Sequence, residues 1–319
     1  MNDFKPKSRF LFIGGNDGIL KQVDIEKKAL VKDYGEVANA VIKSMATSNN
    51  TKYLFTSDMT GHLQIWEISV LGDTSKWDVE HRLVLKYQQK MHENAIGSIT
   101  ITPNSKYLFT SDYNGTLAQW AIQDAKISIN FYQKIHNGEV YSIATTSDSK
   151  YLFTSSYNGY IKQWFIFGEC SFIKEFARVC FGILIIVLSQ DNKYLFLGTQ
   201  SGYLKQLDIK KKSVSDLGKI AHNPIHAMLT SRDTKFLFVN EKFGDITQWN
   251  IKRRYIVKNI KYILGPGVYI TAMENTNDGR YLFIGDSKGE LKQWDVFGQT
   301  LVKEFKGLNL DSITSLKLT

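Results

Sequence analysis

The chain has 319 residues, of which 43% are hydrophobic, 13% are aromatic and four are prolines, a composition that supplies a large core and excludes a low-complexity or proline-rich chain. Its formal net charge of +9 comes mainly from lysine, because only seven of its 40 basic residues are arginine. Few planar guanidinium groups are therefore present for bidentate recognition of phosphates or bases, which weakens the case for a nucleic-acid-binding protein.

Residues 1–8 are polar and charged and lack the apolar core of a secretory signal, so we expect a cytoplasmic protein. The first predicted elements follow directly. A strand through Phe10–Ile13 leads into the turn Gly14–Gly18, and a second strand continues through Val23. The letters Asn-Asp-Gly in this turn are typical of a tight β-hairpin, because such a turn needs backbone conformations with positive φ.

This strand–turn–strand unit occurs seven times, each time around Tyr-Leu-Phe or Phe-Leu-Phe, and its clearest copy runs from Ser105 to Trp120. The turn glycines are Gly18, Gly61, Gly115, Gly159, Gly202, Gly244 and Gly289. Successive glycines are 42 to 54 residues apart, which is the period of a four-stranded propeller blade rather than of a helical repeat. Because each blade buries its apolar faces only against its neighbours, we expect one domain over residues 1–319.

The interval after the second unit is the longest, with 54 residues between Gly61 and Gly115. The additional residues lie at 69–81, between the predicted third and fourth strands, and they include Trp77. Insertions in repeat proteins fall in loops on one face. Trp77 is therefore a candidate partner-binding residue.

The middle of the chain contains its longest apolar run, Cys180–Leu188, which is too short for a membrane-spanning helix. It falls where a first blade strand is due, so we interpret it as a buried strand and expect no membrane association. Cys170 and Cys180 lack metal-ligand or redox spacing, and we expect buried free thiols. The six histidines show no metal-binding spacing, and the sequence shows no arrangement of a nucleophile with a general base and an acid. The sequence therefore predicts no metal, no cofactor and no enzyme.

The end of the chain supplies a strand that its beginning lacks. Residues 312–316 are similar to Gly97–Ile101, which opens a blade, whereas the first unit starts with its second strand. We therefore predict that Ile313 and Leu316 lie in one sheet with Phe10 and Phe12. The fold prediction is an all-β, seven-bladed β-propeller of four-stranded antiparallel blades, closed by pairing of the C-terminal strand with the N-terminal blade, which removes exposed sheet edges.

The repeated unit resembles the WD-repeat family of β-propellers over essentially the whole chain. That family has a histidine before the first strand, a hydroxyl on the second, an Asp in the turn and Trp-Asp at the end of the third. The matching residues in two consecutive units are His92, Thr110, Asn114 and Trp120, then His136, Thr154, Asn158 and Trp164. The resemblance implies structural tetrads between blades, with Asn in place of the Asp that accepts from the imidazole.

Some units depart from this pattern at more than one position. In the first unit the Trp and hydroxyl positions hold Val23 and Ile13, so donor and acceptor are lost together. Trp249 and Trp294 remain although the hydroxyl is gone, and their indole N–H groups need another partner. The joint loss favours a structural role for the tetrad. The family resemblance implies a non-catalytic protein–protein interaction scaffold or structural subunit of a larger assembly, monomeric within its complex.

Large side chains stand two residues before the glycine in three successive units, at Met59, Tyr113 and Tyr157. On neighbouring turns of one face they would form a patch that could anchor a peptide or a protein domain. The alternative is ordinary aromatic cover over the blade ends.

Basic residues collect in the predicted turns between third and fourth strands. They are Lys27 and Lys28, Lys210, Lys211 and Lys212, and Lys252, Arg253 and Arg254. These turns belong to blades that are close around the ring, so their charges could combine to attract an acidic protein partner. The alternatives are a propeller that binds RNA or another polyanion through this lysine-rich face, and simply solvated turn lysines.

Overall fold

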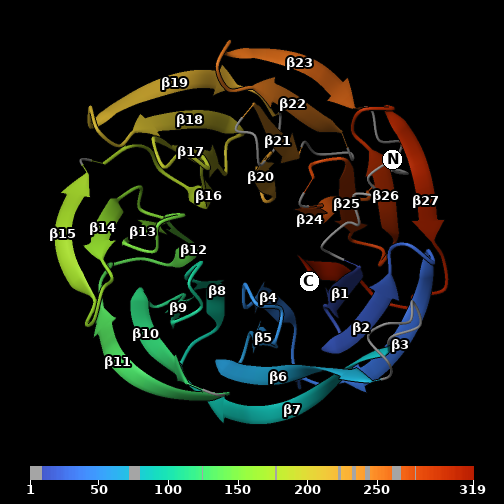
Figure 1. Cartoon of the computed structure of the whole chain (residues 1–319). Helices are drawn as coiled ribbons and strands as arrows, with labels where there is room; N and C mark the ends of the chain where they lie inside the picture. Colours follow the sequence, from blue (N-terminus) through green and yellow to red (C-terminus); the bar gives the residue numbers. More distant parts are fainter. Residues whose placement is uncertain are drawn as a thin grey trace, which may run out of the picture.

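The computed structural model describes residues 9–71, 80–123, 125–176, 178–221, 224–231, 235–240, 245–260, 267–276 and 278–319. These residues form seven four-stranded antiparallel sheets arranged as blades around a central axis (Figure 1). The predicted all-β, seven-bladed propeller is confirmed. Among the described residues there is no helix of the length and apolarity that crossing a membrane requires.

Each blade runs from an innermost to an outermost strand, and blade 1 has the order β28-β1-β2-β3. The innermost strands are β28 (Ile313–Leu318), β4 (Ile42–Thr47), β8 (Ile96–Ile101), β12 (Val140–Thr145), β16 (Ile183–Leu188), β20 (Met228–Thr230) and β24 (Ile270–Asn275). The second strands are β1 (Phe10–Gly15), β5 (Tyr53–Asp58), β9 (Tyr107–Asp112), β13 (Tyr151–Ser156), β17 (Tyr194–Thr199), β21 (Phe236–Asn240) and β25 (Tyr281–Asp286).

The outer half of each blade is a hairpin. Its third strands are β2 (Ile19–Asp24), β6 (His62–Leu71), β10 (Thr116–Gln123), β14 (Ile161–Phe165), β18 (Tyr203–Asp208), β22 (Ile246–Asn250) and β26 (Leu291–Asp295). The outermost strands are β3 (Ala29–Glu36), β7 (Glu80–Lys90), β11 (Lys126–Lys134), β15 (Ser171–Phe176), β19 (Ser213–Lys219), β23 (Tyr255–Ile260) and β27 (Thr300–Phe305).

The repeated Leu-Phe pair explains why the blades stack. Successive side chains of a strand point to opposite faces, so Leu and Phe of one second strand enter the two seams on either side of their blade. Phe12 of blade 1 packs in one cluster with Leu54 of blade 2, and Phe55 of blade 2 packs with Leu108 of blade 3. The phenylalanines are all fully buried: Phe12, Phe55, Phe109, Phe153, Phe196, Phe238 and Phe283. Burial of each ring contributes about 1.5–3 kcal/mol.

The ends of the described chain close the ring, as predicted. Strand β28 pairs antiparallel with β1, with Ile313 opposite Gly15, Leu316 opposite Ile13 and Leu318 opposite Leu11. The same side chains join one core cluster with Phe283 of blade 7. Blade 1 is thus assembled from the two ends of the chain, and each second strand has a neighbour on both sides.

The additional residues of blade 2, at 69–81, were predicted to form a loop, and the structure differs in part. Part of the expected loop extends the hairpin, because Ser69 pairs with Arg82 and Leu71 with Glu80. The candidate Trp77 lies outside the described residues. The apolar run predicted as a buried strand contains β16, which begins at Ile183.

Candidate functional site

The disc has two faces with different chemistry. The turns between second and third strands lie against the segments that lead into the innermost strands, since Tyr113 N–H donates to the Ala95 carbonyl (3.1 Å) and Tyr157 N–H to Glu139 (2.8 Å). We call this side the tyrosine face. The turns between third and fourth strands, with the basic residues, lie on the opposite side, which we call the lysine face.

Blade 3 contains a fully connected polar network between strands. Trp120 Nε1 donates to Thr110 Oγ1 at 2.9 Å, and Thr110 Oγ1 lies 2.7 Å from His92 Nε2. The other ring nitrogen, His92 Nδ1, lies 3.0 Å from Asp112 Oδ2. Because the Thr110 oxygen accepts from the indole, its proton is free for Nε2, and Nδ1–H then donates to the carboxylate.

The acceptor of this network is Asp112 and not Asn114, which corrects the assignment made from the family resemblance. Asp112 ends β9 with 1% of its surface exposed, whereas Asn114 is exposed at the turn. The second oxygen of Asp112 accepts from the backbone N–H groups of Asn114 and Thr116. Burial raises the pKa of Asp112, but the hydrogen bonds from His92 and these N–H groups outweigh it and leave the pKa below its usual value.

The corresponding network of blade 4 is shorter. Trp164 Nε1 donates to Thr154 Oγ1 at 3.1 Å, and Thr154 Oγ1 lies 2.9 Å from His136 Nε2. Ser156 replaces the carboxylate at the end of the second strand. The Asn158 side chain lies against Gly138 instead of completing the tetrad. Burial, with a smaller effect of the Lys162 charge, lowers the pKa of His136 to about 3.

Four aromatic side chains form a continuous series on the tyrosine face, here called the aromatic arc: Tyr113, Tyr141, Tyr157 and Phe181. Successive ring centroids are 4.9, 5.8 and 5.0 Å apart. Such ring pairs contribute about 0.5–1.5 kcal/mol each beyond their buried area. The sequence identified Tyr113 and Tyr157 but missed the two rings that connect and extend them.

Both ends of the arc contact further groups. Arg178 lies over the Phe181 ring at 5.7 Å, and Phe181 itself is 56% exposed. At the other end, burial and the neighbouring Tyr141 raise the pKa of Tyr113 to about 12, so its hydroxyl remains a neutral hydrogen-bond donor. Met59, the third residue of the predicted patch, occupies the equivalent turn of blade 2 and is 37% exposed.

The arc borders a hollow of about 810 Å³ at the centre of the tyrosine face. In six blades the innermost strand has a bulge at its start, where one extra residue is left unpaired, as Lys43 is between Ile42 and Ser44. A bulge re-aims a side chain. Six bulged residues and His226, at the equivalent place in blade 6, all line the hollow: Thr314, Lys43, Gly97, Tyr141, Leu184, His226 and Thr271.

The sequence contains a signal for this ring of residues. Each one stands between the first buried aliphatic residue of its innermost strand and, in most blades, a small residue, as in Ile96-Gly97-Ser98. The serine then links neighbouring blades: Ser98 Oγ accepts from Ile143 N–H, and Ser142 Oγ from Ile186 N–H. The bulged residue therefore differs from blade to blade, whereas the backbone around it is the same in most blades.

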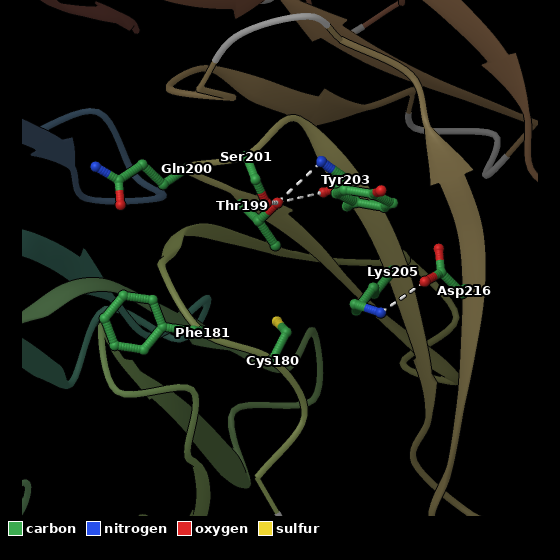
Figure 2. A pocket seen from close by; sticks show the side chains of 8 residues that line it. All are labelled: Cys180, Phe181, Thr199, Gln200, Ser201, Tyr203, Lys205 and Asp216. Atoms are coloured by element: carbon green, nitrogen blue, oxygen red, sulfur yellow. Dashed lines mark hydrogen bonds and ion pairs between the residues drawn. The ribbon is translucent and has the colours of Figure 1, made fainter.

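A second hollow of about 580 Å³ adjoins the first and is lined by blade 5 and by the segment that leads into it (Figure 2). Gln200 lines both hollows and accepts a hydrogen bond from the Tyr157 hydroxyl. Deeper in the second hollow, Lys205 Nζ is paired with Asp216 at 2.7 Å. Burial raises the pKa of the Cys180 thiol to about 11, so this sulfur is protonated at neutral pH and is a poor nucleophile.

The lysine face has the expected turns, and all eight of its basic candidates are exposed: Lys27, Lys28, Lys210, Lys211, Lys212, Lys252, Arg253 and Arg254. A side chain at the end of the third strand caps each turn, since Asp208 accepts from Lys211 N–H and Asn250 from Arg253 N–H, both at 2.8 Å. Blade 7, between these blades and blade 1, presents Phe297, which is 69% exposed. Within the described part of the chain no cluster of His, Cys, Asp and Glu side chains is suited to hold a metal ion.

Comparison with protein families finds the model described as WD domain, G-beta repeat, at residues 84–121 and 130–164. These stretches include most of blades 3 and 4, the two blades in which histidine, threonine and tryptophan are hydrogen-bonded. Comparison with curated proteins finds no match.

Proposed function

We propose that this chain, a β-propeller of the WD-repeat type, is a non-catalytic scaffold that binds a protein partner on its tyrosine face and serves as a subunit of a larger assembly. Propellers with WD repeats are generally interaction scaffolds. The observation that carries the choice of face is the aromatic arc beside the central hollow. Phe181 is exposed and the three tyrosines of the arc are partly exposed, and aromatic groups at the edge of a concavity are typical anchors of protein interfaces.

The chemistry of the hollows supports binding rather than catalysis. The thiol of Cys180 is held protonated by burial, and Lys205 is neutralised by Asp216. His136 and Asp112 are engaged in the strand networks of their blades and do not line either hollow. The reactive side chains of these blades thus stabilise the disc.

The test compares capture of partners by three forms of the chain. Tyr113→Ala combined with Tyr157→Ala removes two rings of the arc, and Tyr255→Ala removes an exposed tyrosine from β23 on the outer rim as a matched control. We expect affinity capture from the native source, read by mass spectrometry, to recover the same partners with the wild type and the control. The double variant should lose at least one of them. Identical recovery by all three forms would contradict the proposal.

The alternative function is polyanion or RNA binding through the lysine face, and the exposure of all eight basic turn residues favours it. Such binding would weaken steeply with salt, because each phosphate contact releases counterions. Charge reversal at Lys210, Lys211 and Arg253 should then abolish binding of a labelled RNA at low salt. If RNA binding is unchanged by this reversal, the lysine face is not its site. The cytoplasmic location stays a prediction.

A further inference from the structure

The central hollow contains a basic group without a counter-charge. Lys43 is the bulged residue of β4 and lines the hollow, yet no described residue forms an ion pair or hydrogen bond with its ammonium group. His226 lines the same hollow, and the Lys43 charge acts on it across the central opening. Among the described residues that line the hollow there is no carboxylate.

Lys43 is partly buried, and an ammonium group that has lost part of its hydration is stabilised by a negative charge beside it. This burial lowers the pKa of Lys43. Desolvation first, and the charge of Lys43 second, also lower the pKa of His226, which favours its neutral form. Lys43 is the only lysine or arginine among the described residues of the lining.

One positive charge matches one carboxylate better than a phosphate, which carries about −1.5 to −2 at neutral pH. Two of the hydroxyl groups in the lining already have partners. Thr314 donates to the Ile42 carbonyl at 2.6 Å, and Thr271 donates to the Ile313 carbonyl. These two hydroxyls are therefore engaged as donors to the backbone, and the choice of a carboxylate rests on the single lysine charge of the described lining.

We propose that the central hollow binds one aspartate or glutamate side chain of an extended, otherwise apolar peptide segment of the partner, with Lys43 as its counter-charge and His226 as a second hydrogen-bond donor. This inference rests on the proposed function and names the chemistry that its tyrosine face recognises. The path of the peptide follows the adjoining hollows. From Lys43 the segment passes the rings of Tyr141 and Tyr157 and then reaches the second hollow. Figure 2 shows Gln200 and Phe181, the two residues of that hollow which it would meet.

The ring of bulged residues gives a reason for this path. Gly97 leaves its position without a side chain, and the Tyr113 ring covers it, since a Cβ on Gly97 would lie 2.5 Å from Tyr113 Cε1. Between Lys43 and Tyr141 the ring of bulged residues therefore presents the apolar Tyr113 ring instead of a side chain of its own. A carboxylate and its neighbouring apolar side chain could then be bound side by side.

The experiment starts from a displayed library of random twelve-residue peptides selected on the full wild-type chain. We expect the selected peptides to share one Asp or Glu next to aromatic or aliphatic residues. Replacing that acid by its amide in a synthetic peptide should weaken binding about thirtyfold, the effect of removing one partner of a desolvated charge pair. Lys43→Met should cause a similar loss for the acidic peptide and no further loss for the amide.

Two controls accompany these measurements. Lys211→Met removes an exposed lysine from the lysine face and should leave the affinity unchanged. Lys43→Met should unfold at a temperature no lower than wild type, because it removes a partly buried, unpaired charge and retains an apolar stem of similar length. A peptide with phosphoserine in place of the acid should bind more weakly than the acidic peptide.

The outcomes separate this inference from the proposed function. Peptides that bind Lys43→Met as tightly as wild type but are lost on Tyr157→Ala would overturn the carboxylate site and leave the scaffold function standing. Tighter binding of the phosphoserine peptide would overturn the single-carboxylate chemistry. Selection of no binding peptide would count against both.

Discussion

Blades 3 and 6 place the same large side chain in very different polar surroundings. Trp120 and Trp249 are each 6% exposed, and each packs in a core cluster. The indole N–H of Trp120 donates to Thr110, whereas Val239 stands at the corresponding position of blade 6 and Trp249 Nε1 has no hydrogen-bond partner among the described residues. Trp294 of blade 7 is orphaned in the same way. The tryptophan is thus tolerated for its packing alone, and the tetrad is an additional stabilising device of particular blades.

The largest expected effect is on Thr110, the residue that joins the network of blade 3. Thr110→Val leaves both the Trp120 N–H and His92 Nε2 without a partner in a buried site. We expect the free energy of unfolding to fall by about 3 kcal/mol, because each orphaned buried group costs about 1–3 kcal/mol. Denaturant unfolding measures it. Thr300→Val, at an exposed position of β27, is the control and should change stability by less than about 0.5 kcal/mol.

The next effect tests which side chain completes the network. Asp112→Asn removes a charged acceptor from His92 and from two backbone N–H groups, and should cost about 2 kcal/mol of unfolding free energy. Asn114→Ala should cost less than about 0.5 kcal/mol, because its side chain is exposed. Equal losses of unfolding free energy in the two variants would mean that Asn114, and not only Asp112, completes the network.

The network of blade 4 can be tested through the pH dependence of stability, because its histidine has no carboxylate partner corresponding to Asp112. The pKa of His136 is about 3 in the folded chain against 6.5 for a free histidine. Between these values the unfolded chain binds a proton that the folded chain does not, so stability is full above pH 6.5 and falls as the pH falls. The loss should reach about 2 kcal/mol at pH 5. His136→Gln should flatten this part of the stability profile, and an unchanged profile would contradict the assignment.

The smallest effect separates the indole N–H from the indole ring. Trp120→Phe and Trp249→Phe remove similar volumes, but only the first breaks a hydrogen bond and leaves Thr110 short of a donor. Trp120→Phe should therefore be more destabilising, by about 1 kcal/mol. Thermal unfolding of the two variants side by side measures the difference. Equal losses would mean that the indole of blade 6 also has a partner, such as a bound water.

Much of the fold could be predicted because its determinants are local and periodic. The repeated Leu-Phe pair and the turn glycines mark each blade, and a strand missing from the first unit reappears after the last. The site was predicted only in part. Tyr113 and Tyr157 share one position in the repeat, so the sequence groups them, whereas Phe181 belongs to a different position and a later blade.

The sequence by itself determined the number of blades, the residues that fill their seams and the closure of the ring, because each depends on alternation along a strand and on a repeat that meets only its neighbours. The tertiary structure alone decided which polar groups meet. Asp112 rather than Asn114 reaches His92 because the end of β9 turns that side chain inward. Likewise, bulges in two separate innermost strands bring Lys43 and Tyr141 to one hollow, which His226 also lines, although the three residues are far apart in the chain.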